Sequence, residues 1–191
     1  MMRFIFICMA LTGALVTPAL AHTGVGQTSS FASGIAHPLH GADHILAMVA
    51  VGLWATIRGG RAIRAWPMAF VSTMLAGFAA ATWGLRVPFV EPAISSSIIA
   101  LGLFVALTVK APVGLGAAIT GLFGFVHGHA HGTEVMGAGL IPYAAGFALA
   151  TAGLHAAGIV LGLFAERAIG KVVCRAMGGL AVLSGIALMA G

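Results

Sequence analysis

The sequence has 191 residues, of which 60% are hydrophobic and only 7% are charged. Soluble domains are about 45–50% apolar and about 25% charged, so this composition excludes an ordinary soluble globular domain. The formal net charge is +5. The basic residues lie in short connections between apolar segments, where they indicate membrane topology rather than nucleic-acid binding. We therefore expect the lipid bilayer, and no nucleic acid, as a partner.

Residues 1–21 predict a cleavable signal peptide. Arg3 supplies the positive start, an apolar run follows, and Ala19-Leu20-Ala21 is a small-x-small cleavage site. The alternative is an uncleaved transmembrane helix, but the run is short for a span and Pro18 ends it. We expect no disulfide framework, because Cys8 would be removed with the signal peptide.

The remaining residues, 22–191, predict an all-α, polytopic membrane domain with six transmembrane helices. A helix needs about 20 predominantly apolar residues to cross the hydrocarbon core. The apolar segments of suitable length lie at 32–57, 66–84, 93–109, 112–132, 138–164 and 172–190. Glycines spaced four residues apart predict close helix packing on the fourth and fifth segments; they are Gly124, Gly128 and Gly132, and Gly158 and Gly162.

The distribution of basic residues favours one orientation in the membrane. If residue 22 lies outside, the connections 58–65, 110–111 and 165–171 face the cytoplasm. The basic residues on or next to that side are then Arg58, Arg61, Arg64, Lys110, Arg167, Lys171 and Arg175. Only Arg86 remains outside, so the positive-inside rule places both termini on the outer face of a bacterial inner membrane.

A first polar cluster opens the mature chain: His37-Pro38-Leu39-His40-Gly41-Ala42-Asp43-His44. His37, His40 and His44 follow i, i+3, i+7 spacing and would share one face of a continuous helix. Asp43 adds a hard oxygen ligand beside them. Pro38 complicates this picture, because it either opens the helix or kinks a longer one.

A second cluster, His127-Gly128-His129-Ala130-His131-Gly132-Thr133-Glu134, lies far downstream. Within it, His127, His131 and Glu134 follow i, i+4, i+7 spacing and would share one helix face. Ionisable groups at membrane depth are costly and mark a site or pathway. We expect a metal site built from His37, His40, Asp43, His44, His127, His131 and Glu134. We also expect the first and fourth segments to be neighbours, with the glycines of the fourth allowing their close approach.

Three further histidines are candidates for a metal pathway. His129 points off the shared face and is expected to matter least. His155 stands alone within the fifth segment, where it either lines a pathway or forms a hydrogen bond to a neighbouring helix. Cleavage after residue 21 would make His22 the N-terminal residue, as a minor capture group or as a solvated terminus.

Imidazole and carboxylate ligands suit Ni²⁺, Co²⁺, Zn²⁺, Fe²⁺ or Cu²⁺. We expect a divalent transition-metal ion as a transported partner and no permanently bound cofactor. Two alternatives to a permease stay open. One is a histidine-rich membrane metalloenzyme, although the chain has only four acidic residues. The other is a metal-binding accessory or sensor subunit, although the chain has no nucleotide-binding motif.

The clusters resemble the HupE/UreJ family of nickel and cobalt permeases. The matching motifs are His37-Pro38-x-x-Gly41-x-Asp43-His44, Phe125-x-His127-Gly128-x-Ala130-His131-Gly132-x-Glu134, and His155 with Gly158. The resemblance covers the whole chain, including the signal peptide and six spans. It implies a permease, not an enzyme, that carries Ni²⁺ or Co²⁺ inward to supply metalloenzymes such as hydrogenase or urease.

The topology predicts opposite accessibility for two connections. Cysteines introduced at Gly60 and at Arg86 should react with a membrane-impermeant thiol reagent from opposite sides, because the first lies in a basic cytoplasmic connection. Labelling of both positions from the same side would contradict the six-span topology.

Overall fold

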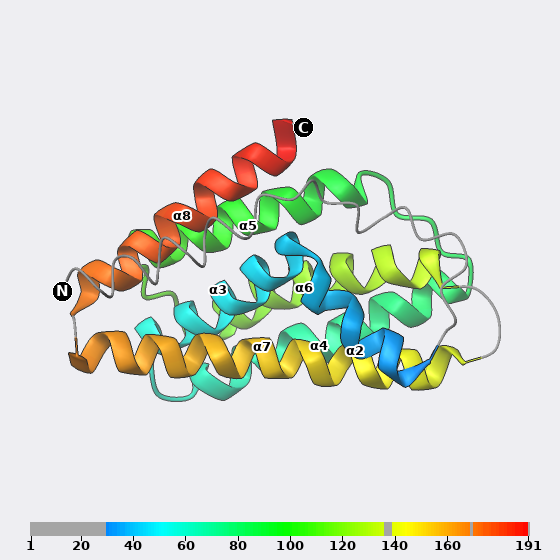
Figure 1. Cartoon of the computed structure of the whole chain (residues 1–191), viewed down its shortest axis with the longest axis horizontal. Coiled ribbons are helices and arrows are strands. Elements are labelled where there is room, and N and C mark those ends of the chain that lie inside the picture. Colours follow the sequence, from blue (N-terminus) through cyan, green and yellow to red (C-terminus); the bar gives the residue numbers. More distant parts are fainter. Residues whose placement is uncertain (1–29, 136–138, 169, 191) are drawn as a thin grey trace.

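The computed structural model describes residues 30–135, 139–168 and 170–190. Within these ranges the chain is all-helical, which confirms the predicted class (Figure 1). The helices are α2 (Phe31–His40), α3 (Ala42–Arg58), α4 (Ala62–Thr82), α5 (Val90–Ala106), α6 (Val113–Glu134), α7 (Leu140–Ala168) and α8 (Lys171–Ala190). The predicted signal peptide and His22 lie outside the described residues.

Four of these helices, α4, α6, α7 and α8, are long and apolar enough to cross a membrane. The pair α2 and α3 passes the same test only when taken together, and α5 is apolar but shorter. Several apolar helices of this length identify a multi-pass membrane protein.

The first predicted segment, 32–57, is not one helix, because α2 and α3 meet at an angle of 84° around Gly41. Ser30 caps the start of α2: its hydroxyl accepts the Ser33 N–H at 3.1 Å, and the Ser33 hydroxyl accepts the Ser30 N–H at 2.9 Å. Pro38 lies in the last turn of α2, where it removes a backbone donor. Pro38 therefore does not open the helix; it precedes a sharp break.

Both halves of this broken element pack along the straight helix α7 (Figure 1). A Cβ on Gly34 of α2 would overlap the carbonyl group of Tyr143 near the start of α7. Further along, a Cβ on Gly158 would lie 3.0 Å from the carbonyl carbon of Val49 in α3. The predicted packing role of the glycines on the fifth segment is confirmed, because backbones approach here as closely as glycine allows.

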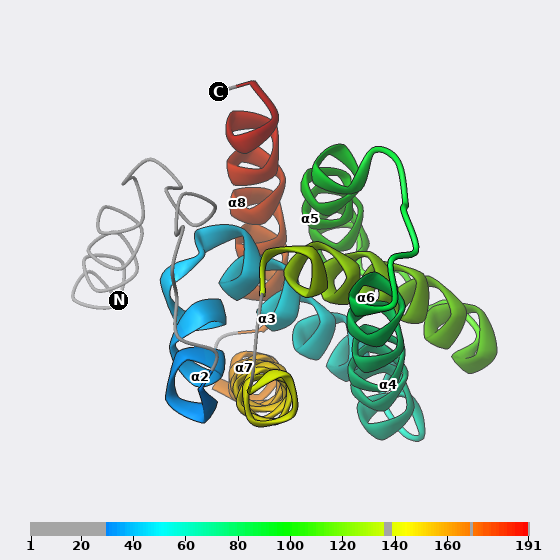
Figure 2. The ribbon, with the colours of Figure 1, turned by 90° about the vertical axis from the view of Figure 1, so that its right-hand side faces the viewer.

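The glycine stripe of α6 packs against α4 (Figure 2). Gly124, Gly128 and Gly132 face the carbonyl groups of Phe70, Met74 and Phe78 in turn. The stripe thus serves close packing as predicted, but the expected partner is wrong. Helix α4 occupies this surface instead of the first segment. Its backbone carbonyl groups follow the same four-residue spacing as the glycines.

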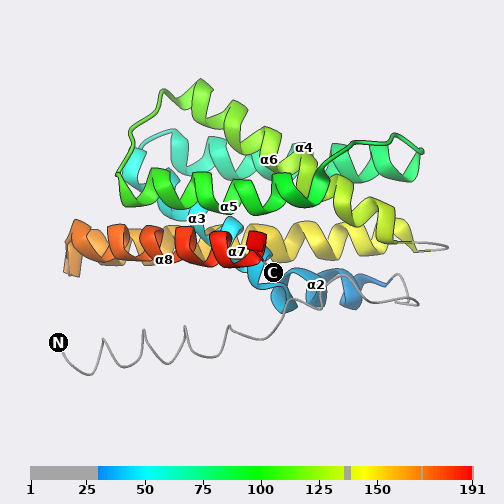
Figure 3. The same ribbon diagram turned by 90° about the horizontal axis from the view of Figure 1, so that it is seen from above.

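The third pair consists of α5 and α8, which run side by side (Figure 3). Gly102 and Gly178 face each other across this contact, and a Cβ on Gly178 would lie 2.7 Å from the carbonyl oxygen of Gly102. The described fold is therefore an assembly of three closely packed helix units: α2 and α3 with α7, α4 with α6, and α5 with α8.

Three side chains tie the α3–α4 region to the α5–α6 connection at one end of the molecule. Trp54 Nε1–H donates to the carbonyl of Val109 at 2.8 Å, and Arg58 Nε–H donates to that of Ala111 at 3.0 Å. Trp66 Nε1–H donates to the carbonyl of Val113, the first residue of α6, at 2.9 Å. The end of α7 and the start of α8 lie at the same end (Figure 1). The connections predicted to be basic and cytoplasmic are therefore grouped together.

The α5–α8 contact yields a prediction with a matched control in the adjacent residue. Gly178→Ala should lower the free energy of unfolding by about 1–3 kcal/mol, because the new methyl group overlaps the backbone of α5. Gly179→Ala meets no atom within 4 Å and should leave stability equal or slightly higher. Denaturant unfolding of the purified protein in detergent measures both values. Equal values for the two variants would contradict the packing described here.

Candidate metal centre

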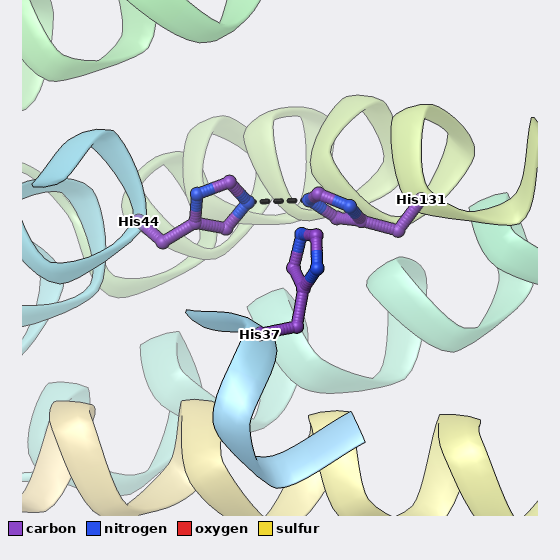
Figure 4. A group of neighbouring side chains, drawn as sticks. All are labelled: His37, His44 and His131. Carbon is purple, nitrogen blue, oxygen red and sulfur yellow. Dashed lines mark hydrogen bonds between the residues drawn. The ribbon is translucent and has the colours of Figure 1, made fainter. Parts of the chain in front are cut away.

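Three imidazoles from three helices converge on one point inside the protein (Figure 4). His37 comes from α2, His44 from α3 and His131 from α6. One nitrogen of each ring lies within 4.8 Å of the others. The ring centroids are 4.3 Å apart for His37 and His131, 4.5 Å for His44 and His131, and 5.6 Å for His37 and His44. His44 and His131 are fully buried.

The break at Gly41 brings the two histidines of the first cluster together. On a straight helix, His37 and His44 would be separated by about 10 Å along the axis. The 84° bend turns their rings towards each other instead. A Cβ at Gly41 would lie 2.6 Å from both Asp43 Oδ1 and His44 Nδ1, so no larger residue fits at the bend without moving them.

A carboxylate lies behind each of the two fully buried rings. His44 Nδ1–H donates to Asp43 Oδ1 at 2.8 Å, and His131 Nδ1–H donates to Glu134 Oε2 at 3.3 Å. Because an ionised carboxylate only accepts, these bonds keep the proton on Nδ1 and leave a lone pair on each Nε2. The two Nε2 atoms contact each other (Figure 4). Two lone pairs directed at one point favour a cation between them.

The two carboxylates differ in their access to solvent. The side chain of Asp43 is 10% exposed, whereas that of Glu134 is 32% exposed. Asp43 thus belongs to the buried face of the group, and Glu134 lies at its rim. Both were predicted as direct ligands, and the structure places each on the far nitrogen of an imidazole. Carboxylates in this position orient a ligating histidine and raise its basicity.

His127 is a fourth imidazole beside the group. It is fully buried one turn before His131, and its ring centroid lies 5.7 Å from that of His44. Its Nδ1–H donates to the carbonyl of Phe123 at 2.8 Å, so its Nε2 also carries a lone pair. The predicted shared face of His127, His131 and Glu134 is confirmed by these contacts.

His40 is not brought to the group. It is exposed, and its Nδ1–H donates back to the carbonyl of Ala36 at 2.7 Å. The expected single face of His37, His40 and His44 is wrong, because α2 ends at His40 and the chain turns before His44.

The two other described candidates lie away from the three converging nitrogens. His129 Nε2–H donates to the carbonyl of Leu85 at 2.8 Å, which holds the α4–α5 connection against α6. His155 is buried on α7 against the ring of Phe70, with centroids 5.0 Å apart. Neither nitrogen of His155 has a hydrogen-bond partner among the described residues, so one of the two alternatives for this residue, a hydrogen bond to a neighbouring helix, is not formed among them.

Two aromatic side chains of α7, which belong to neither histidine cluster of the sequence, also contact the group. The Phe147 ring lies 4.9 Å from that of His131, and the Tyr143 ring lies 6.2 Å from that of His37. Both are buried. Two features of the sequence could have drawn attention to these residues. Tyr143 is the one tyrosine of the chain, and Phe147 follows it at i+4 spacing, which puts both on one helix face. These rings give the imidazole group an apolar wall.

The arrangement has the chemistry of a site for a borderline divalent cation. Neutral imidazoles are common ligands for Ni²⁺, Co²⁺, Zn²⁺ and Cu²⁺. Three ring nitrogens from three helices leave further coordination positions open to water, and the buried Asp43 carboxylate offsets part of the ion's charge.

Comparisons with known proteins cover nearly the whole chain. Residues 9–188 match the family described as HupE / UreJ protein. Protein HupE of Rhizobium leguminosarum bv. viciae is 42% identical over 180 residues, which are 93% of this chain and 94% of that protein. No solved structure matches the chain. The matched region includes both histidine clusters.

The hydrogen bond from His44 to Asp43 yields a prediction about affinity. Asp43→Asn keeps the shape of the side chain but allows its amide to donate to Nδ1, which moves the ring proton to Nε2. The affinity of the purified protein for Ni²⁺ should fall about 10–100-fold, as for other partners of ligating histidines. Isothermal titration in detergent measures it, with Gly114→Ala, which meets no atom within 4 Å, as the control. An unchanged affinity would show that this hydrogen bond does not prepare His44 for the metal.

Proposed function

The chain belongs to the HupE/UreJ family, which is associated with nickel and cobalt transport, and we propose that it is a secondary permease for Ni²⁺ or Co²⁺. The direction is from outside the bacterial inner membrane to the cytoplasm, where the ion supplies metalloenzymes such as hydrogenase or urease. The observation that carries the proposal is the convergence of His37, His44 and His131 between apolar helices. Such a group at membrane depth needs a functional reason.

Capture of the ion begins at Glu134. Its partly exposed carboxylate lies at the rim of the group and attracts a hydrated divalent cation. The same carboxylate holds the ring of His131, so the first negative charge that the ion meets is coupled to the first imidazole.

Binding follows as imidazole nitrogens replace water molecules. The Nε2 lone pairs of His44 and His131 and a nitrogen of His37 are the proposed ligands. Asp43 and Glu134 hold two of these rings, and water fills the remaining positions. Raw affinity in such a site favours Cu²⁺, so a preference for Ni²⁺ or Co²⁺ arises from geometry.

The proposed topology has six spans with both termini outside. The pair α2 and α3 forms one broken span, and α5 forms a short one. Interrupted helices at membrane depth are tolerated where they are buried in protein or line a cavity, and transporters use them at binding sites. The metal group lies near the C-terminal end of α6, whereas the basic α5–α6 connection precedes its start. With the basic connections inside, the proposed topology has the group in the outer half of the membrane.

Uptake of labelled Ni²⁺ tests the proposal. Cells that express the chain alone should accumulate Ni²⁺, and His44→Ala or His131→Ala should reduce uptake roughly tenfold or more at equal protein abundance, because each removes a converging ligand. His40→Ala and His129→Ala should remain active, because their ring nitrogens are bonded to backbone carbonyls away from the group.

Two results would count against this function. If the chain alone gave no uptake, an accessory role with a partner transporter would replace it. If His129→Ala were as damaged as His44→Ala, the assignment of the converging imidazoles as the metal site would be wrong. Proteoliposome uptake with Co²⁺, Zn²⁺ and Cu²⁺ as competitors measures selectivity.

A further inference from the structure

His155 is a buried imidazole that the three-histidine group does not use. It lies on α7, is 1% exposed, and neither of its ring nitrogens has a hydrogen-bond partner among the described residues. In either neutral tautomer, one N–H and one lone pair are then buried without a partner, which is unfavourable. An apolar side chain would fill the same space without this penalty, so packing alone does not account for a histidine here.

His127 presents a second lone pair to the same region. Its Nδ1–H is bonded to the carbonyl of Phe123, and its buried Nε2 has no hydrogen-bond partner among the described residues. The ring of Phe70, on α4, contacts both imidazoles, with centroids 5.4 Å from His127 and 5.0 Å from His155. Helices α4, α6 and α7 thus bring two imidazoles onto one aromatic ring.

This region lies further from the rim than the three-histidine group. Phe147, which contacts His131, is eight residues before His155 on α7, a separation of about 12 Å along the helix axis. His127 connects the two levels, because its ring also contacts that of His44. These contacts order the imidazoles from the outer group through His127 to His155.

We propose that His127 and His155 form an inner binding site for the transported divalent cation, below the outer group of His37, His44 and His131. This inference rests on the proposed permease function. Among the described residues, no carboxylate is hydrogen-bonded to either ring, whereas two carboxylates hold the outer group. The inner site thus binds the ion more weakly than the outer one, as onward movement requires.

His155→Leu tests the inner site in proteoliposomes that contain a Ni²⁺-sensitive dye. The maximal rate of Ni²⁺ uptake should fall about tenfold or more, while the half-saturating concentration stays within about twofold of wild type, because the outer group is intact. Ni²⁺ binding in detergent should lose a weak equivalent and keep the tight one. The melting temperature should not fall, because an apolar replacement removes unpaired polar atoms.

The matched control is Thr151→Val, one turn earlier on α7. The Thr151 hydroxyl is buried and donates to Met74 Sδ at 3.6 Å, so this variant removes a buried polar group but no imidazole. Its uptake should stay within about twofold of wild type.

A maximal rate for His155→Leu within about twofold of wild type would overturn the inner site and leave the proposed function standing. Loss of the tight Ni²⁺ equivalent in His155→Leu would also overturn it, because His155 would then act on the outer group. Absence of Ni²⁺ uptake by the wild-type protein would instead remove the permease function, and the inner site with it.

Discussion

The hydrogen bonds from His44 to Asp43 and from His131 to Glu134 determine what this protein can bind. Each bond fixes a ring proton on Nδ1 and leaves a lone pair on Nε2. Without these carboxylates, the two rings could face each other as donor and acceptor and satisfy themselves. With them, both rings direct Nε2 lone pairs at one buried point, and a cation bound there would accept both lone pairs.

The packing of the helices holds this electrostatic arrangement in place. The glycines of α6 hold this helix, which carries His127 and His131, against α4, and glycines likewise allow α2 and α3 to pack closely on α7. The metal group lies where these two units meet, and α2 and α3 reach α6 through side chains rather than through a packed helix surface. Rigid units around a junction of side chains suit a transporter, because small movements between the units change the ligand geometry.

A graded sequence of polar groups leads inward from the rim. Glu134 is partly exposed, and the three converging imidazoles are backed by two carboxylates. His155 lies deeper, and within the described part of the chain no carboxylate is bonded to it. In the proposed permease, such a series lowers the penalty of moving a charged ion stepwise through an apolar interior. In the proposed permease, the decrease in negative charge along the series would keep the ion from being held too tightly.

The sequence by itself determined the all-helical class, the membrane setting and the bounds of α4 to α8 to within a few residues, and it displayed the histidines and carboxylates of the two clusters. These features depend on local composition and spacing, which a single chain displays directly. The shared helix face of His127, His131 and Glu134 could also be predicted from their spacing, because α6 is a continuous helix through these residues.

Only the tertiary structure decided which candidates meet. The spacing of His37, His40 and His44 assumed a continuous helix, and the break at Gly41 excluded His40 while joining the other two to His131. Pro38 signals a possible kink, but the 84° angle of the break depends on how α2 and α3 pack along α7, which no local pattern specifies. The contact of His155 with Phe70 likewise joins helices that are distant in sequence, so only their assembly in space could reveal it.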